Sequence, residues 1–222
     1  MMKNNFLRAA VLGTVAMLSS VGSASAGTIT LTGLGFYQYP VPMLISNGTV
    51  LENAVAGQIN IVLDGQSLIA YCVDLFTNIG LSTYNSTSGD PSGYTNGTRA
   101  AWILDTYKAG VTNNEAGAAL QLALWDVVHD GGDGLSNGNV RLDPTGSASL
   151  RTAAEAIVTA SAGHASNNAT ILHNSSSDGT PRQTLITDRI LQVSSIVDTP
   201  EPGSLLMAAA GLCLFGFRRR PC

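Results

Sequence analysis

The chain has 222 residues, of which 45% are hydrophobic and only 12% are charged, and its formal net charge is −4. That length allows one domain with a buried core plus terminal appendages. Residues 27–199 hold 6 Lys and Arg against 14 Asp and Glu, a net charge of −8, which excludes a nucleic-acid binder that relies on a basic face.

The first 26 residues have the pattern of a secretory signal peptide. Lys3 and Arg8 supply the positive start, Ala9–Leu18 is an apolar run, and Ala24-Ser25-Ala26 is a small-residue cleavage site. We therefore expect signal peptidase to cut after Ala26. The alternative is an uncleaved anchor helix, which the shortness of the apolar run disfavours.

The last 23 residues form a second recognisable segment. Pro200-Glu201-Pro202 precedes the uncharged stretch Leu205–Phe217, and the cluster Arg218-Arg219-Arg220 follows. As a helix this stretch would rise about 20 Å, less than the roughly 30 Å hydrocarbon core of a bilayer, and the arginines predict an inside C-terminus. This order resembles the PEP-CTERM sorting signal; a plain tail anchor is the alternative.

The PEP-CTERM resemblance implies a route of export in a Gram-negative bacterium. In that family, an exosortase of the inner membrane is expected to cleave the protein near the motif and to release it or transfer it outward. We therefore expect a transient tether to the inner membrane on the periplasmic side, followed by a location at the cell surface or outside the cell.

Between these ends, the pattern first predicts strands. Polar and apolar residues alternate over Thr28–Thr32, as in a strand. The segments Gly57–Leu63 and Ser67–Val73 flank Asp64-Gly65, which is a strong hairpin signal. A strand or strand pair is also expected over residues 184–197. The polar segments 78–98 and 167–178 are expected to be loops.

Three helices are predicted near the middle of the chain. They cover Arg99–Lys108, Asn114–His129 and Ser147–Ala162, with Asn113 or Asn114 as the cap of the second, which should end at Gly131-Gly132. The expected fold is α+β: a β-rich, sandwich- or barrel-like body with a helical insertion. The expected domains are a signal peptide (1–26), this body (27–195), and a linker with the sorting signal (196–222), which contains a short transmembrane helix.

Two residues of the body need a chemical explanation. Cys72 is the only cysteine outside the tail, since Cys213 and Cys222 lie in or behind the apolar stretch, so the body can form no intramolecular disulfide. Gln121 lies in the middle of a predicted helix, on a stripe with Leu124, Trp125 and other apolar residues. A buried amide must find partners or cost a few kcal/mol.

The motif around these residues resembles the thioester domain of Gram-positive surface adhesins. Tyr71-Cys72-Val73-Asp74 lies in a β-region, and Gln121-Leu122-Ala123-Leu124-Trp125 lies on a later helix. The resemblance implies that Cys72 and Gln121 condense, with loss of ammonia, into an internal thioester. Tyr71, Asp74, Trp125 and His129 would surround that bond. The chain departs from the family at Leu120, where Thr is usual.

A thioester is an electrophile that can acylate an amine or hydroxyl of a partner once per molecule. The first hypothesis is therefore covalent attachment to a surface or matrix nucleophile, with no cofactor and no enzymatic turnover. In the second, the protein is a non-covalent structural or binding component of an exopolysaccharide or biofilm matrix, with Cys72 a small buried side chain. The third and weakest is a hydrolase built on Cys72 and His129.

Residues near the end of the second helix leave two further possibilities open. His129 is either a base near the thioester or a side chain that interacts with the helix C-terminus. Asp130 and Asp133, in Asp130-Gly131-Gly132-Asp133-Gly134, have the oxygen ligands that Ca²⁺ prefers. No known calcium-loop spacing is complete, so a solvated turn is favoured and no metal is expected.

Overall fold

The computed structural model of the chain describes residues 26–45 and 50–189. The described part contains seven strands: β1 (Ala26–Ile45), β2 (Val50–Leu63), β3 (Gln66–Cys72), β4 (Thr83–Gly89), β5 (Val140–Leu142), β6 (Ala169–Ser175) and β7 (Pro181–Asp188). Its helices are α1 (Gly97–Tyr107), α2 (Asn114–Asp130) and α3 (Ala148–Ala160), with short 3₁₀ turns at Pro91–Gly93 and Lys108–Gly110. The predicted α+β class, a β-rich body with a helical insertion of three helices, is confirmed.

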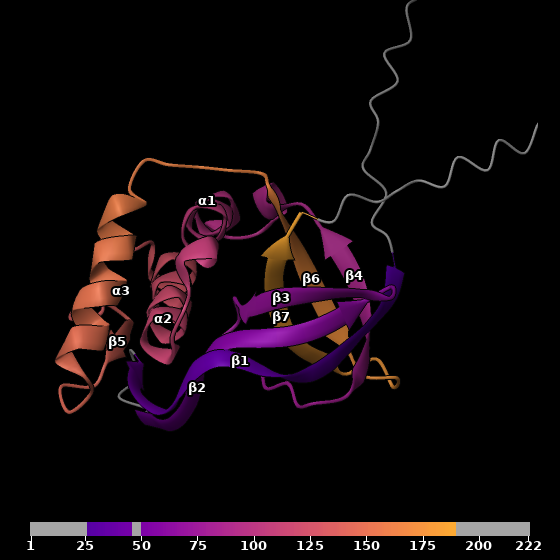
Figure 1. Cartoon of the computed structure of the whole chain (residues 1–222), viewed down its shortest axis with the longest axis horizontal. Coiled ribbons are helices and arrows are strands. Elements are labelled where there is room, and N and C mark those ends of the chain that lie inside the picture. Colours follow the sequence, from indigo (N-terminus) through magenta and orange to yellow (C-terminus); the bar gives the residue numbers. More distant parts are fainter. Residues whose placement is uncertain (1–25, 46–49, 190–222) are drawn as a thin grey trace, which may run out of the picture. The chain divides into compact units, whose positions relative to one another are not determined.

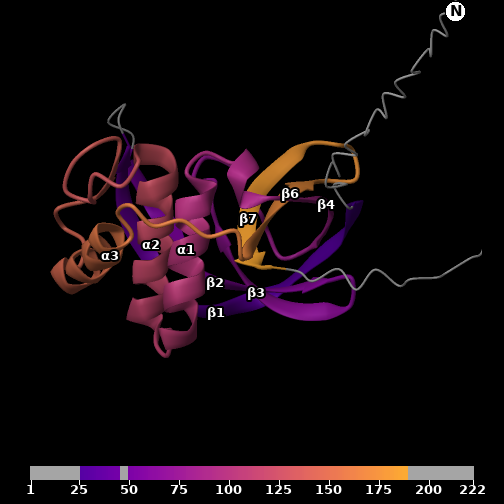
Figure 2. The same ribbon diagram turned by 90° about the horizontal axis from the view of Figure 1, so that it is seen from above.

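The strands form one antiparallel sheet that closes on itself. Its order is β2-β3-β7-β6-β4-β1-β5, and β1 also pairs with β2, so six strands complete a ring. The long strand β1 makes this closure possible, because its first residues pair with β4 and its last residues pair with β5. The helices gather beside one end of the sheet, with α2 between α1 and α3 (Figures 1 and 2).

Two apolar clusters fill the described part of the chain. Alternate residues of β3 point to opposite faces, so Cys72 belongs to the cluster inside the closed sheet and Tyr71 to the one on its outer face. Helix α2 contributes to both clusters, and its residues from Gly117 to Val128 are all buried. Over this stretch the helix is surrounded on all sides, so the polar residues that it carries there are buried as well.

Local signals account for the predicted hairpin and for two of the helix starts. Asp64 and Gly65 have φ values of 48° and 81°, as a two-residue hairpin turn requires. Asn113 accepts a hydrogen bond from the N–H of Ala116 and begins α2, while Gly131, at φ 73°, ends it. Ser147 caps α3 in the same way.

Two segments predicted as loops are strands. β4 lies within 78–98 and β6 within 167–178, so both predictions are wrong over these residues. β4 (TYNSTSG) is mostly polar and lacks a hydrophobic alternation, but it is paired on both sides, by β1 and β6. Sheet pairing therefore overrides a composition that is typical of loops. β5, which is three residues long, was not predicted.

The described residues include no helix that is long and apolar enough to cross a membrane. The predicted short helix at residues 205–217 lies outside the described residues, as do the signal peptide before Ala26 and the domain boundary near residue 195. Ala26, the predicted cleavage residue, is the exposed first residue of β1 and pairs with Thr87.

Candidate functional site

Cys72 ends β3, with its side chain on the inner face of the closed sheet. It is 5% exposed and belongs to the same cluster as Ile59 on β2 and Leu185 on β7. Burial raises the pKa of its thiol, and the charge of Asp74 raises it further. The thiol therefore keeps its proton at neutral pH, and a free Cys72 would be a poor nucleophile toward reagents in solution.

The side-chain amide of Gln121 is hydrogen-bonded to the backbone of Cys72. The N–H of Cys72 donates to Oε1 of Gln121 at 2.9 Å, and Nε2 of Gln121 donates to the carbonyl oxygen of Cys72 at 2.7 Å. The β2–β3 pairing ends at Ile59 and Ala70, two residues before Cys72. The amide thus takes the place of the next strand residue, and Gln121 is 0% exposed.

A glycine lets α2 approach the sheet closely enough for this contact. Gly117 lies one helical turn before Gln121, on the same side of α2. A Cβ on Gly117 would overlap the carbonyl oxygen of Phe36 and come within 3.0 Å of its Cβ. The small residue brings the helix backbone against β1 and thereby puts the amide within reach of β3.

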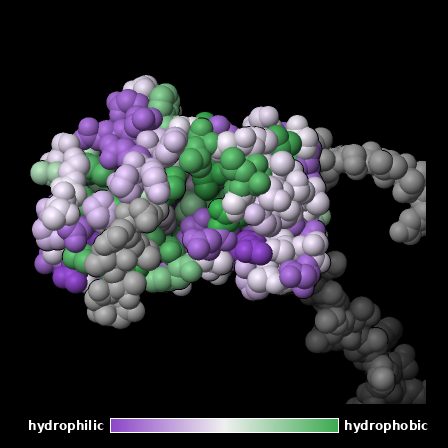
Figure 3. Space-filling model, turned by 90° about the horizontal axis from the view of Figure 1, so that it is seen from below, coloured by the Kyte–Doolittle hydropathy of each residue, from purple (hydrophilic) through white to green (hydrophobic). Residues whose placement is uncertain are grey.

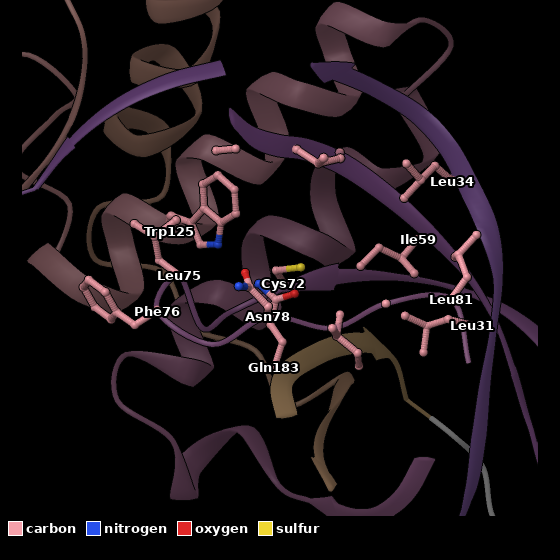
Figure 4. A pocket seen from close by; sticks show the side chains of 15 residues that line it. Leu31, Leu34, Ile59, Cys72, Leu75, Phe76, Asn78, Leu81, Trp125 and Gln183 are labelled. Atoms are coloured by element: carbon pink, nitrogen blue, oxygen red, sulfur yellow. The ribbon is translucent and has the colours of Figure 1, made fainter. Parts of the chain in front are cut away.

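An apolar pocket of about 730 Å³ reaches Cys72 (Figure 4). It is lined by Leu31, Leu34, Ala54, Val55, Gly57, Ile59, Cys72, Leu75, Phe76, Asn78, Ile79, Gly80, Leu81, Trp125 and Gln183; Gln121, although described, is not part of this lining. Four lining side chains, Leu34, Val55, Phe76 and Leu81, are 39% to 64% exposed. A broad hydrophobic area is visible on one face of the molecule (Figure 3).

Trp125 brings an unused donor to this pocket. Its Nε1 atom is buried and has no hydrogen-bond partner within the described part of the chain. The indole nitrogen is directed toward the middle of the pocket, on the side of Cys72 and Asn78 (Figure 4). A buried indole N–H normally has a partner, so this one is available to an oxygen that enters the pocket.

The two neighbours of Cys72 named from the sequence lie in different environments. Tyr71 faces the outer cluster, where burial raises the pKa of its hydroxyl to about 12, against a smaller opposite effect of Gln58. Asp74 orders the turn after β3: its Oδ1 accepts from the N–H of Phe76 at 2.9 Å, and its carbonyl oxygen accepts from Nε2 of Gln183 at 2.7 Å. Sequence reasoning missed Gln183, which lies in a segment without a motif.

His129 lies beyond Trp125 on α2 and is already hydrogen-bonded. Its Nε2 accepts from the N–H of Leu75 at 3.2 Å, and its ring makes an edge contact with Phe76, with 5.1 Å between centroids. Burial is the main cause that lowers its pKa. The lone pair that a general base would use is therefore directed at a backbone N–H in this arrangement.

Three aspartates cluster at the end of α2. Oxygens of Asp130 and Asp133, the two residues considered from the sequence, lie within 4.8 Å of each other and of an oxygen of Asp126. Burial raises the pKa of Asp126 to about 7, although a hydrogen bond from Gly134 opposes this. The sequence carried a signal for Asp126, because positions 126 and 130 lie one turn apart on a helix, but its apolar neighbours concealed it.

The comparisons with known proteins identify the tail. Residues 198–220 match the PEP-CTERM protein-sorting motif, which contains Pro200, Glu201, Pro202, Arg218, Arg219 and Arg220; these residues lie outside the described part. The motif implies an exported protein that passes by way of the membrane and interacts transiently with exosortase.

For the body, the comparisons give only a distant likeness. No curated protein matches the chain. Among solved structures, the N-terminal domain of the Streptococcus pyogenes pilus tip adhesin Cpa is similar, with a TM-score of 0.39 and 14% identity over 72% of this chain and 98% of that one.

Proposed function

We propose that this exported protein forms an internal thioester between Cys72 and Gln121 and uses it once, to attach itself covalently to a nucleophile. The observation that carries the proposal is the pair of hydrogen bonds between the Gln121 amide and the Cys72 backbone. This contact fixes a carboxamide beside the residue that bears the thiol. Proximity of that kind can supply about 7–11 kcal/mol of a barrier.

The condensation balances without a cofactor. The Cys72 sulfur attacks the side-chain carbonyl carbon of Gln121, the C–N bond breaks, and the thiol proton leaves on the nitrogen as ammonia. The N–H of Cys72, 2.9 Å from Oε1, donates to the oxygen on which negative charge develops, as in an oxyanion hole. Nε2 must give up its bond to the Cys72 carbonyl, which is the cost of the step.

The pocket supplies both protection and access. Its apolar lining limits water at the sulfur, which slows hydrolysis of the product. Its open side lets an amine or hydroxyl on a chain-like partner reach the thioester, and the N–H of Trp125 is the donor available to the carbonyl oxygen there. A surface protein amine or a polysaccharide hydroxyl of the matrix fits this chemistry. The reaction consumes the bond, so each molecule acts once and is not an enzyme.

One observation favours a second function. Both polar atoms of the Gln121 amide are satisfied without any reaction, as in a purely structural contact between α2 and β3. In that case the protein is a non-covalent structural or binding component of the exopolysaccharide matrix. The pocket would then be its binding surface.

Mass measurement separates the two functions. The full chain is purified, its termini are defined by peptide mapping, and its intact mass is compared with that of Cys72→Ala. The thioester gives a wild-type mass about 17 Da below the sequence value, the mass of ammonia. The deficit should be absent in Cys72→Ala and replaced by a methylamine adduct on residue 121 after treatment with methylamine.

Alkylation provides the control for the matrix function. A full sequence mass, with Cys72 alkylated only after unfolding, would contradict the thioester and support the structural contact.

In the context of the sorting motif, we further propose that the body is held in the periplasm of a Gram-negative bacterium before it reaches the cell surface. Fractionation of cells with and without exosortase tests that step.

A further inference from the structure

The end of α2 concentrates negative charge where a helix disfavours it. Asp126 and Asp130 lie in the last turns of α2, Asp133 lies in the loop that follows, and their carboxylate oxygens are within 4.8 Å of one another. The C-terminal end of a helix carries a partial negative charge. Like charges at this spacing repel one another, and the repulsion grows as water is excluded.

Asp126 has a buried oxygen with no partner. The residue is 0% exposed. Its Oδ2 accepts a long hydrogen bond of 3.2 Å from the N–H of Gly134, while its Oδ1 is buried and unpartnered within the described residues. An unsatisfied carboxylate oxygen in the interior is more costly than an unsatisfied neutral group, and this oxygen is free to coordinate a cation.

Arg99 acts on Asp126 through its charge, but its hydrogen bonds go to other groups. Arg99 donates instead to Oγ of Ser161 at 2.9 Å and to the carbonyl oxygens of Gly131 at 2.6 Å and Val158 at 2.9 Å. The one salt bridge within the described ranges joins Lys108 and Asp188, on other elements. A divalent cation would offset the negative charge that these three side chains carry when they are ionised.

The loop is shaped around these carboxylates. Asp130 accepts from the N–H groups of Asn139 and Val140 at 2.6 and 2.7 Å, which ties the end of α2 to β5. Gly138, at φ 74°, lies directly against the carboxylates of Asp130 and Asp133, so that any Cβ there would overlap them. Asp130 Oδ1 also accepts from Nδ2 of Asn139 at 2.8 Å, so this carboxylate is held in position.

We propose that Asp126, Asp130 and Asp133 bind one Ca²⁺ ion, which stabilises the loop between α2 and β5. Ca²⁺ prefers carboxylate and carbonyl oxygens in irregular arrangements, whereas Mg²⁺ demands a near-octahedral shell. Sites in extracellular proteins typically bind Ca²⁺ with a Kd of about 0.1–1 mM. The site is independent of the thioester, because it uses none of the atoms of Cys72 or Gln121.

Calcium-dependent unfolding of the full-length protein tests this site. After treatment with EDTA and its removal, thermal unfolding is followed by near-UV circular dichroism with and without CaCl₂, with NaCl added to equalise ionic strength. Several millimolar Ca²⁺ should raise Tm by roughly 5 °C, and Mg²⁺ should do less. Calorimetric titration should give one ion per chain.

Two exposed aspartates provide matched variants. Asp133→Asn removes one ligand charge from an exposed residue and should weaken Ca²⁺ binding by at least about tenfold. Asp178→Asn makes the same change in the β6–β7 turn and should leave the Tm shift intact. A wild-type protein whose Tm does not respond to Ca²⁺, or an Asp133→Asn protein that responds as the wild type does, would overturn the proposal.

Discussion

The middle of α2 and its C-terminal end each bury a polar side chain, with opposite outcomes. Gln121 is completely buried and both atoms of its amide are hydrogen-bonded to Cys72. Asp126, little more than one turn later, is equally buried, but one of its carboxylate oxygens has no partner in the described part.

The first arrangement is a satisfied contact that stabilises the fold. The second is the proposed cation site, in which one carboxylate oxygen is unsatisfied. A satisfied amide stabilises the junction between α2 and the sheet, and thioester formation has to break one of its hydrogen bonds. An orphan carboxylate destabilises its surroundings until something binds.

The largest effect is expected from Gln121→Leu. Compared with the protein before thioester formation, the leucine leaves the N–H and the carbonyl of Cys72 without partners, and each buried orphan group costs about 1–3 kcal/mol. We therefore expect the free energy of unfolding, measured by urea denaturation, to fall by roughly 2–5 kcal/mol.

Gln58→Leu is the matched control for this change. Gln58 is also a buried amide, at 5% exposure, but it accepts one backbone hydrogen bond, from the N–H of Phe36 at 3.1 Å. Its loss should cost about half as much. If Gln121→Leu is no worse than Gln58→Leu, the Cys72 contact does not hold the junction.

Gly117→Ala should loosen the same junction from a distance. Its Cβ would overlap the carbonyl of Phe36, so α2 must shift away from β1, at a cost of about 1–3 kcal/mol. The shift also moves Gln121 away from Cys72, so the mass deficit of about 17 Da expected for the thioester should shrink or disappear.

Gly93→Ala serves as the reference for that experiment. A Cβ on Gly93 meets nothing within 4 Å, and this glycine lies in the 3₁₀ turn before α1. Unfolding and mass should match those of the wild type. A Gly117→Ala protein with a full mass deficit would show that the bond forms without the close approach of the helix.

The elements at this junction could be predicted from the sequence, whereas the thioester stays a prediction. The Asp64-Gly65 hairpin and the cap at Asn113 follow from residue types with fixed backbone preferences, so the elements that carry Cys72 and Gln121 could be found. Strand β4 could not, because only its pairing with β1 and β6 makes its polar residues a strand.

Long-range contacts explain what was missed at the two sites. The hydrogen bonds between Gln121 and Cys72 are possible because the pairing of β2 with β3 ends before Cys72. No local sequence pattern encodes the residue at which a strand pairing ends. Asp126 stands between apolar residues in the sequence, so no local pattern marked it as part of a site. Gln183 reaches Asp74 across 109 positions of sequence.

Alkaline pH should weaken the fold through Cys72 and Tyr71. Burial raises the pKa of the Cys72 thiol above its ordinary value of 9.0 and that of Tyr71 from 10.0 to about 12. The unfolded chain ionises first, so the contribution of these two groups to stability is constant below about pH 9 and falls above it. The loss is up to about 1.4 kcal/mol per pH unit for each group.

Urea denaturation at a series of pH values resolves the two groups. Cys72→Ala should remove the decline that begins near pH 9, and Tyr71→Phe the decline that begins near pH 10. A thioester leaves no thiol to titrate, so the untreated wild type should behave as Cys72→Ala does until methylamine frees the sulfur. Methylamine-treated protein with no decline above pH 9 would contradict the burial of this thiol.

The smallest effect, and the one opposite in sign to Gln121→Leu, is expected from Asp126→Asn. Asparagine keeps an oxygen for the N–H of Gly134 and, above the raised pKa of about 7, removes a buried charge that has no counter-ion. In EDTA at about pH 8 the free energy of unfolding should therefore rise by about 1 kcal/mol. Asp105→Asn, on the exposed face of α1, should change nothing measurable. In saturating Ca²⁺ the order should reverse, because only the wild type gains the free energy of binding. If Asp126→Asn is destabilising in EDTA, the carboxylate already has a partner in the protein and the contrast between the two parts of α2 fails.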